Sequence, residues 1–167
     1  MLLKKNYQNK SYLIFTTYSI LVPVANPQTQ QALLQVAVAI GGLNQSIVYP
    51  LSLVELEEDY LYQSTPEAAA QLIQQKKQIL EDLIQTLEPP EFRKIVQPII
   101  RISNDVPLET ANTALANKVD LVLVGWHRPA FSDNRLGGRV GKILNTSPID
   151  VAVFINKKQN ELYQLLK

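Results

Sequence analysis

A pair of glycines close to several arginines is the part of this sequence best suited to binding an anion. Gly137 and Gly138 precede a predicted helix at 139–144 and follow Gly125 by about a dozen residues. Glycines in this position let backbone amides approach an anion closely, and the amino end of a helix favours negative charge. This pattern predicts a phosphate site. The plainer interpretation, a tight turn flanked by solvated cations, stays open. The nearby charged residues are Arg128, Arg135, Arg139, Lys142 and the single acid Asp133.

The side chains that could catalyse a reaction are few. His127 is the only histidine, and a general base needs a partner acid that the neighbouring sequence does not supply. The absence of cysteine excludes thiolate metal sites and a Cys nucleophile, and one histidine excludes a His-rich metal cluster. The acidic run 55–59 lacks the spacing of a calcium loop, and a predicted helix carries a polar face of Gln74, Gln75, Lys76 and Lys77. We interpret both as solvated surface and predict that the chain is not an enzyme.

Composition describes an ordinary globular chain. Hydrophobic residues make up 46% of the 167 residues, and 16 basic side chains nearly balance 15 acidic ones. A net charge of +1 argues against a nucleic-acid-binding protein, which needs a basic excess. The apolar run at 11–25 loosely resembles a signal peptide but is interrupted by polar residues, and 32–43 is too short to span a bilayer. We therefore expect a cytoplasmic location and no membrane insertion of this chain.

Strand-like and helix-like patterns alternate along the whole chain. Such alternation is typical of a parallel sheet covered on both faces. It predicts a single doubly wound α/β domain with a five-stranded parallel sheet flanked by helices, with residues 1–19 as an extension and 156–167 as a tail. Pro50 predicts a bulge or an exposed edge within its strand. The expected strands are 20–24, 46–54, 95–102, 119–125 and 151–155, and the expected helices are 28–40, 66–87, 107–118 and 139–144.

Two strand ends are the expected ligand site. In open parallel sheets, ligands bind beyond the carboxyl ends of the strands, where the strand order reverses. The first such end is Val24-Ala25-Asn26, and the second is the run from Val124 to Arg128. The glycine pair at 137–138 follows the second end, so the topology would bring the predicted phosphate site to the same edge of the sheet.

The carboxyl-terminal half of the sequence carries a family resemblance. The string DLVLVGWHRPAFSDNRLGGRVGKIL, followed by SPIDVAVFI, resembles the end of a universal stress protein domain, and ILVPV resembles that family's first strand. The resemblance covers residues 20–155 and implies the adenine nucleotide alpha hydrolase-like fold. More narrowly, GWHRPAFS and NRLGGRVG are similar to the universal stress domain appended to cyanobacterial cation/proton antiporters.

The resemblance implies an adenine-nucleotide site for ATP, ADP or AMP. In nucleotide-binding members, the first and second strands hold adenine and ribose, and the loop after the fourth strand and the later glycine hold the phosphates. Residue by residue, this implies contacts from Pro23, Val24, Ala25, Val124, Gly125, His127, Arg128, Gly137, Gly138, Arg139 and Val140.

Three departures from the family pattern bear on this site. The family usually has Asp where Ala25 stands, a glycine where Arg128 stands and a hydroxyl residue where Gly138 stands. The connecting loop is also one residue shorter than the usual pattern. Losing one polar contact costs about 1–3 kcal/mol. Arg128 and Arg139 would compensate only by making charge-assisted hydrogen bonds to phosphate.

Three functional hypotheses follow from these observations. The first is a regulatory adenine-nucleotide-binding module that acts on an attached or partner cation/proton antiporter. The second is a dimerisation module of the same fold that no longer binds nucleotide. The third, an adenylating enzyme, is weakest because the chain contains neither a Ser-Gly-Gly-x-Asp-Ser nor a His-x-Gly-His loop. The apolar strand 151–155 resembles the one that pairs between subunits in the family, which predicts a homodimer through Val151–Ile155.

Overall fold

Helices and strands alternate along the chain as the sequence predicts. The computed structural model describes residues 17–42, 46–55, 66–126 and 138–156. The elements are, in chain order, β1 (Tyr18–Pro23), α1 (Gln30–Gly41), β2 (Ser46–Val54), α3 (Pro66–Gln85), the 3₁₀ helix η1 (Pro90–Ile95), β3 (Ile99–Ile102), α4 (Val106–Ala116), β4 (Leu121–Trp126), α5 (Gly138–Thr146) and β5 (Val151–Ile155).

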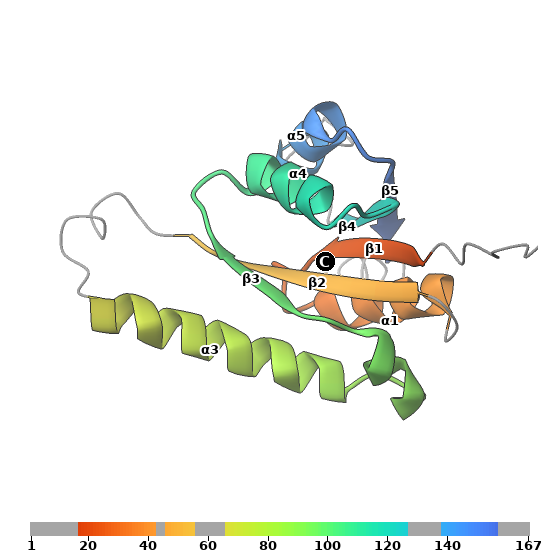
Figure 1. Cartoon of the computed structure of the whole chain (residues 1–167), viewed down its shortest axis with the longest axis horizontal. Coiled ribbons are helices and arrows are strands. Elements are labelled where there is room, and N and C mark those ends of the chain that lie inside the picture. The colour runs from red at the N-terminus through yellow and green to blue at the C-terminus, as the bar shows by residue number, and fades with distance from the viewer. Residues whose placement is uncertain (1–16, 43–45, 56–65, 127–137, 157–167) are drawn as a thin grey trace, which may run out of the picture.

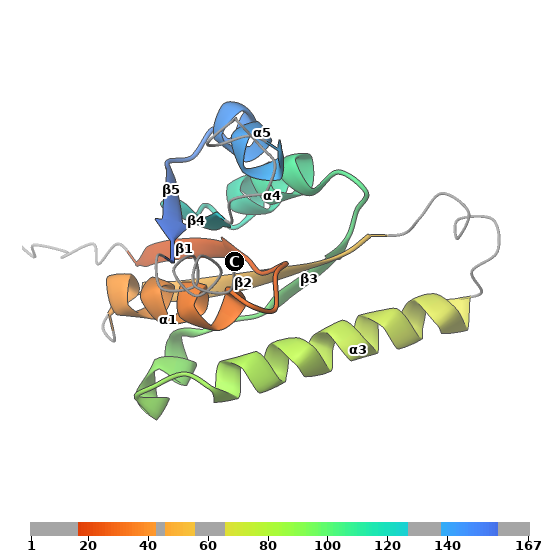
Figure 2. The ribbon, with the colours of Figure 1, turned by 180° about the vertical axis from the view of Figure 1, so that it is seen from behind.

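The five strands form one parallel sheet in the order β3-β2-β1-β4-β5. The chain builds outward from β1 to β3 and then returns to the other side of β1 with β4, so the order reverses between β1 and β4. Helices α1 and α3 cover one face, and α4 and α5 cover the other (Figure 1; Figure 2 shows the same arrangement from behind). The predicted doubly wound α/β domain is confirmed, and ligands are expected beyond the carboxyl ends of β1 and β4.

Each face of the sheet has its own hydrophobic core, because successive side chains of a strand point to opposite sides. Ile20 and Val22 of β1 pack with α1 and α3, whereas Leu21 packs with α4 and α5. The β4 side chains alternate in the same way, with Leu123 on the α1 side and Val122 on the α5 side. Continuous apolar runs in the sequence therefore correspond to strands buried on both faces.

Strand β1 begins at Tyr18, two residues before the predicted start at Ile20. The reason is a polar contact at the amino end of the sheet. The backbone amide of Ser19 donates to Asp120 Oδ2 at 2.7 Å, and the Ser19 hydroxyl donates to the same oxygen at 3.1 Å. Ser19 is consequently buried within the strand, although its side chain gave no strand signal in the sequence.

The predictions for Pro50 and for the third strand are wrong. Pro50 is fully buried in β2, which lies between β1 and β3, and is neither on an edge nor excluded from the strand. Residues 90–95 form η1, and β3 covers only Ile99–Ile102, after an isolated bridge between Val48 and Val96. The register is the same before and after the gap and places Pro50 opposite Pro98. Two prolines without amide hydrogens thus share one interruption of the ladder.

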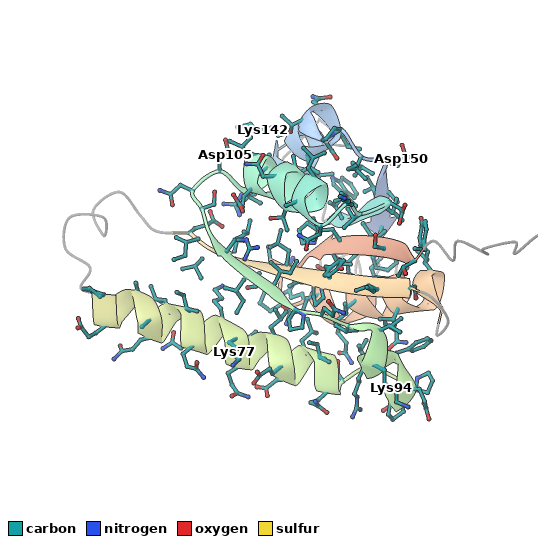
Figure 3. The ribbon with its side chains drawn as sticks, in the orientation of Figure 1. Lys77, Lys94, Asp105, Lys142 and Asp150 are labelled. Carbon is teal, nitrogen blue, oxygen red and sulfur yellow. The ribbon has the colours of Figure 1, made fainter. Side chains whose placement is uncertain are left out.

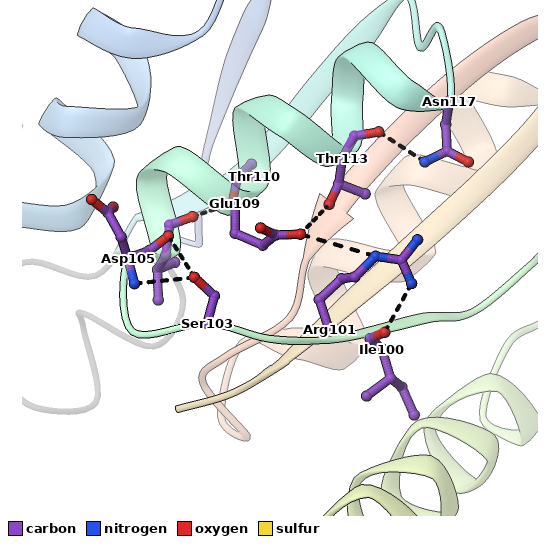
Figure 4. Close-up of polar contacts among 9 residues, drawn as sticks. Ile100, Arg101, Ser103, Asp105, Glu109, Thr110, Thr113 and Asn117 are labelled. Carbon is purple, nitrogen blue, oxygen red and sulfur yellow. Dashed lines mark hydrogen bonds and ion pairs between the residues drawn. The ribbon is translucent and has the colours of Figure 1, made fainter. Parts of the chain in front are cut away.

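Helix α4 begins at a side-chain cap. Asp105 Oδ1 accepts a hydrogen bond from the Leu108 amide at 3.0 Å. The Ser103 hydroxyl accepts one from the Asp105 amide at 3.1 Å, a contact that Figure 4 shows. One turn later, Glu109 lies 3.9 Å from Arg101 Nε of β3. These contacts fix the start of α4 beside the end of β3.

Replacing Asp105 with alanine should lower the free energy of unfolding by about 1 kcal/mol, because the Leu108 amide loses its partner. Chemical denaturation of both proteins measures this difference. Asp82→Ala is the matched control, since Asp82 is exposed within α3 and caps no helix. An unfolding free energy equal to that of the wild type would show that this cap does not hold in solution.

Candidate functional site

A cavity of about 90 Å³ opens at the carboxyl ends of β1 and β2, beside the point where the strand order reverses. Its floor comes from the sheet, and its charged rim comes from three different segments. The lining residues are Pro23, Val24, Ala25, Leu51, Leu53, Glu55, Lys76, Val106 and Arg139. We call this the β1–β2 cleft.

The floor of the β1–β2 cleft is fixed by the backbone. The Val24 amide donates to the Leu51 carbonyl at 2.9 Å, which continues the β1–β2 pairing one residue past the end of β1. Val24 is buried in the core on the α1 side, whereas Ala25 is exposed. Ala25, two residues past the end of β1, therefore lines the cleft at a position from which a longer side chain could reach a ligand.

An ion pair spans the rim of the cleft. Arg139 donates from its two terminal nitrogens to the two carboxylate oxygens of Glu55, at 3.0 and 2.5 Å. This two-pronged geometry is the strongest that arginine makes with a carboxylate. The side chains are 58% and 43% exposed, so solvent screens the pair. The contact joins the residue after β2 to the first turn of α5, 84 positions apart in the sequence.

Lys76 contributes a second cation to the rim, from the middle of α3. Its side chain is partly buried, and among the described residues it has no ion-pair partner. Its neighbour Lys77 is 57% exposed and pairs with Glu81 one turn along the helix. Lys76 is therefore less exposed than the solvated face predicted for residues 74–77, whereas Lys77 is exposed as predicted.

A larger cavity of about 590 Å³ lies next to the β1–β2 cleft, between the start of α4 and helix α5. Asp105 at the start of α4 and Lys142 of α5 both line this cavity and lie near each other in Figure 3. Val106 and Arg139 line both cavities and so form the boundary between them. The remaining lining residues are Asn104, Pro107, Leu108, Gly138, Asn145 and Thr146.

The structure brings together part of the predicted site. Pro23, Val24, Ala25 and Arg139 line one cleft, although the two segments are more than 100 residues apart. Gly138 opens α5 with a φ of 71° and lines the larger cavity, and Val140 packs against the core on the α4 and α5 side. His127, Arg128 and Gly137 lie outside the described residues.

Two residues of the predicted site, Val124 and Gly125, pack against other parts of the chain. Val124 is buried in the core between β4 and α5. A Cβ on Gly125 would lie 3.3 Å from Leu33 Cδ2 and 3.7 Å from Thr29 Oγ1, so this glycine allows α1 to pack closely on β4. Neither residue lines the cavities described above. Their predicted contact with a ligand remains a prediction.

Sequence reasoning missed Glu55 and Lys76. Glu55 has one usable signal, because it directly follows a strand whose carboxyl end faces the expected site. Lys76 has none, since it sits in a polar stretch of α3 beside Lys77, which faces elsewhere. The described part of the rim therefore carries two cations and one carboxylate, a set suited to holding an anion.

Two further features are absent from the described residues. They contain no group of three or more His, Cys, Asp or Glu side chains placed to hold a metal ion. Within the same ranges, none of the helices has the length and apolar character that crossing a bilayer requires.

Known proteins resemble this chain at three levels. The model of the universal stress protein family matches residues 17–154. The Na(+)/H(+) antiporter NhaS5 of Synechocystis sp. (strain ATCC 27184 / PCC 6803 / Kazusa) is 29% identical over 112 residues, which are 66% of this chain and 15% of the antiporter. This chain thus matches only a small part of that transporter's length.

Solved structures share the fold. The hypothetical protein MJ0577 superposes with a TM-score of 0.67 at 20% identity, over 84% of this chain and 97% of its own. A universal stress protein solved in complex with cAMP gives a TM-score of 0.59 at 14% identity, over 82% of this chain and 96% of its own. At such identities, the likeness establishes the α/β architecture and not the ligand.

Proposed function

Because this chain belongs to the universal stress protein family, we propose that it is a regulatory module that binds an adenine nucleotide at the β1–β2 cleft. The observation that carries the proposal is the meeting of Pro23, Val24 and Ala25 with the cations Lys76 and Arg139 around one cavity. This cavity lies where open parallel sheets bind ligands. The cAMP complex of a protein with the same fold supports the choice of ligand class.

The proposed division of labour follows the position of each group. The apolar ends of β1 and β2 offer a surface for the purine, and the cations at the rim attract phosphate. The predicted contacts from His127, Arg128 and Gly137 belong to the same proposal. We propose no catalytic step, so ATP should not be hydrolysed faster in the presence of the protein than in buffer.

Calorimetric titration with ATP, ADP, AMP and cAMP tests the proposal. We expect Arg139→Ala to weaken ATP binding about fivefold, because one partly screened charge-assisted contact is worth about 1 kcal/mol at this exposure. Arg101→Ala is the control, since Arg101 is also an exposed, ion-paired arginine but lines neither cavity. Equal losses in both variants would place the phosphate elsewhere.

A second candidate function is a dimerisation module without a nucleotide. It is favoured by two observations: Glu55 already occupies Arg139, and the cleft itself holds only about 90 Å³. Ligand sites for small molecules usually measure about 300–1,000 Å³. If calorimetry detects no heat of binding for any of the four nucleotides, the result favours this second candidate over the first.

Both candidates include a homodimer. Within the described sheet, β5 pairs only with β4, so its other edge is open. Val151 and Val153 pack on one core and Ala152 and Phe154 on the other, which leaves the strand apolar on both faces. An open apolar edge favours pairing with a second copy.

The relation to the antiporter NhaS5 suggests where such a module acts. We propose that it operates at the cytoplasmic face of a membrane, attached to or bound by a cation/proton antiporter, and that nucleotide occupancy changes the transport rate. Proton-coupled sodium flux through the antiporter, measured in vesicles with and without ATP, tests this. An unchanged flux would separate the module from transport.

A further inference from the structure

Three charged side chains from three segments share the rim of the β1–β2 cleft. Glu55 follows β2, Lys76 lies on α3, and Arg139 lies at the start of α5. Two of them, Glu55 and Arg139, are already bound to each other. The state of this small cluster therefore decides how much positive charge the cleft offers to a ligand.

The ion pair uses the atoms that phosphate would need. Arginine binds phosphate as it binds carboxylate, through two parallel N–H groups of its planar fork. In Arg139 both terminal nitrogens donate to Glu55. A phosphate group can take the same two-pronged position only by replacing the Glu55 carboxylate, so Glu55 and phosphate compete for one guanidinium.

Lys76 is the cation of the cleft that is open to an anion. Lys76 is partly buried and lines the cleft, and the described residues hold no carboxylate in ion-pair contact with it. An ammonium group on a flexible stem can follow a ligand as a point charge without a fixed geometry. Lys76 can therefore meet an incoming phosphate before Arg139 is released.

The same exchange would change the size of the site. Arg139 stands at the boundary between the β1–β2 cleft and the cavity of about 590 Å³ between α4 and α5. The smaller cavity alone is below the usual size of a small-molecule site, whereas the larger one falls within the usual range. A phosphate held by Arg139 would lie at this boundary, with room on both sides.

We infer that Lys76 and Arg139 form the phosphate-binding pair of this cleft and that Glu55 is a built-in competitor that weakens it. The inference rests on the proposed function for the identity of the ligand, but its charge chemistry applies to any phosphorylated compound. It makes the affinity of the site depend on one carboxylate that does not touch the ligand when the ligand is bound.

The Glu55→Gln variant tests the competition. Gln keeps the shape of the side chain and removes its charge, so pyrophosphate and ATP should each bind about fivefold more tightly than to the wild type. The gain should increase from adenosine to AMP to ADP to ATP. Glu91→Gln is the matched control, because Glu91 is an exposed carboxylate in η1, which adjoins the amino end of β3 at the other end of the sheet. An equal gain in both variants would overturn the competition.

The Lys76→Gln variant tests the second half of the pair. We expect it to weaken the binding of ATP and pyrophosphate to the Glu55→Gln background about fivefold. Lys77→Gln, one residue along the same helix, removes the same charge where it pairs with Glu81 and should change neither affinity by more than about twofold. If the two substitutions weaken binding equally, Lys76 does not contact the phosphate.

Pyrophosphate separates this inference from the proposed function. If Glu55→Gln binds pyrophosphate more tightly but neither protein prefers ATP over pyrophosphate, the phosphate pair stands and the adenine site fails. If ATP binds the wild type and Glu55→Gln equally well, the adenine site stands and the competition fails. If Glu55→Gln binds no phosphate compound, the inference is wrong.

Discussion

Replacing Ile155 with lysine is expected to convert the proposed dimer into monomers at micromolar concentration. Ile155 ends β5, is 45% exposed and belongs to the edge strand through which we propose pairing. A lysine there would carry its charge into an apolar contact, and inserted lysines are a common means of blocking edge-to-edge pairing. We expect the dissociation constant to rise on the order of a hundredfold. Analytical ultracentrifugation over a concentration series measures it.

The opposite edge of the sheet supplies the control. Ile102 ends β3, the other edge strand, and is 47% exposed. Ile102→Lys therefore makes the same chemical change at nearly the same exposure, and it should leave the dimer intact. If Ile102→Lys dissociates the dimer and Ile155→Lys does not, pairing runs through β3. A wild-type protein that sediments as a monomer at micromolar concentration would contradict both arrangements.

A backbone substitution tests pairing without adding charge. The Val122 amide donates to the Asp150 carbonyl, and amides of a parallel strand alternate between its two neighbours. In this register the Val153 amide faces the open edge of β5. Val153→Pro removes that donor without taking a β4–β5 hydrogen bond and should also favour the monomer.

The sheet could be predicted from the sequence because its strands are local patterns. Runs such as the one in β4 are apolar throughout, since both faces of a central parallel strand are covered. Turn signals separate these runs from amphipathic helices, and the alternation leaves few possible topologies. Strand β5 has the predicted bounds, and β2 does as well.

The third strand shows where local reasoning ends. Residues 95–102 are apolar enough for one continuous strand, but Pro98 has no amide hydrogen to donate. The pairing at Pro98 depends on Pro50, which lies opposite it in β2. The two prolines are too far apart in the sequence for a local pattern to relate them. A proline predicted to mark an edge is instead buried, because its neighbour shares the defect.

Some contacts of the candidate site could likewise be predicted from the sequence, and others could not. The meeting of Pro23, Val24 and Ala25 with Arg139 could be predicted, because topology brings strand ends and helix starts to one edge. The ion pair between Glu55 and Arg139 could not, since it depends on where two side chains end after the sheet has formed. Lys76 and Lys77 differ only in their angular position on α3. The sequence shows this difference, but it does not show which of the two positions faces the cleft.

Restoring the family's acid by Ala25→Asp should raise the affinity for adenosine and its nucleotides. Ala25 is exposed at the end of β1 and lines the β1–β2 cleft, so a carboxylate there can accept hydrogen bonds from a bound nucleoside. One such contact is worth about 1–3 kcal/mol, which corresponds to about 5-fold to 150-fold in affinity. Calorimetry with adenosine and ATP measures the change. Ala70→Asp, an exposed position on α3 outside the cavities, is the control.

The gain from Ala25→Asp should be largest for adenosine and smallest for ATP. The new carboxylate joins Glu55 at the same cleft, so it repels phosphate and offers Lys76 and Arg139 another partner. This order is the reverse of the one expected for Glu55→Gln, where the gain grows with phosphate charge. Each variant therefore reports on one half of the ligand. Parallel trends in the two variants would show that neither residue acts through the contact assigned to it, whereas opposite trends would place the nucleoside beside β1 and the phosphates beside α3 and α5.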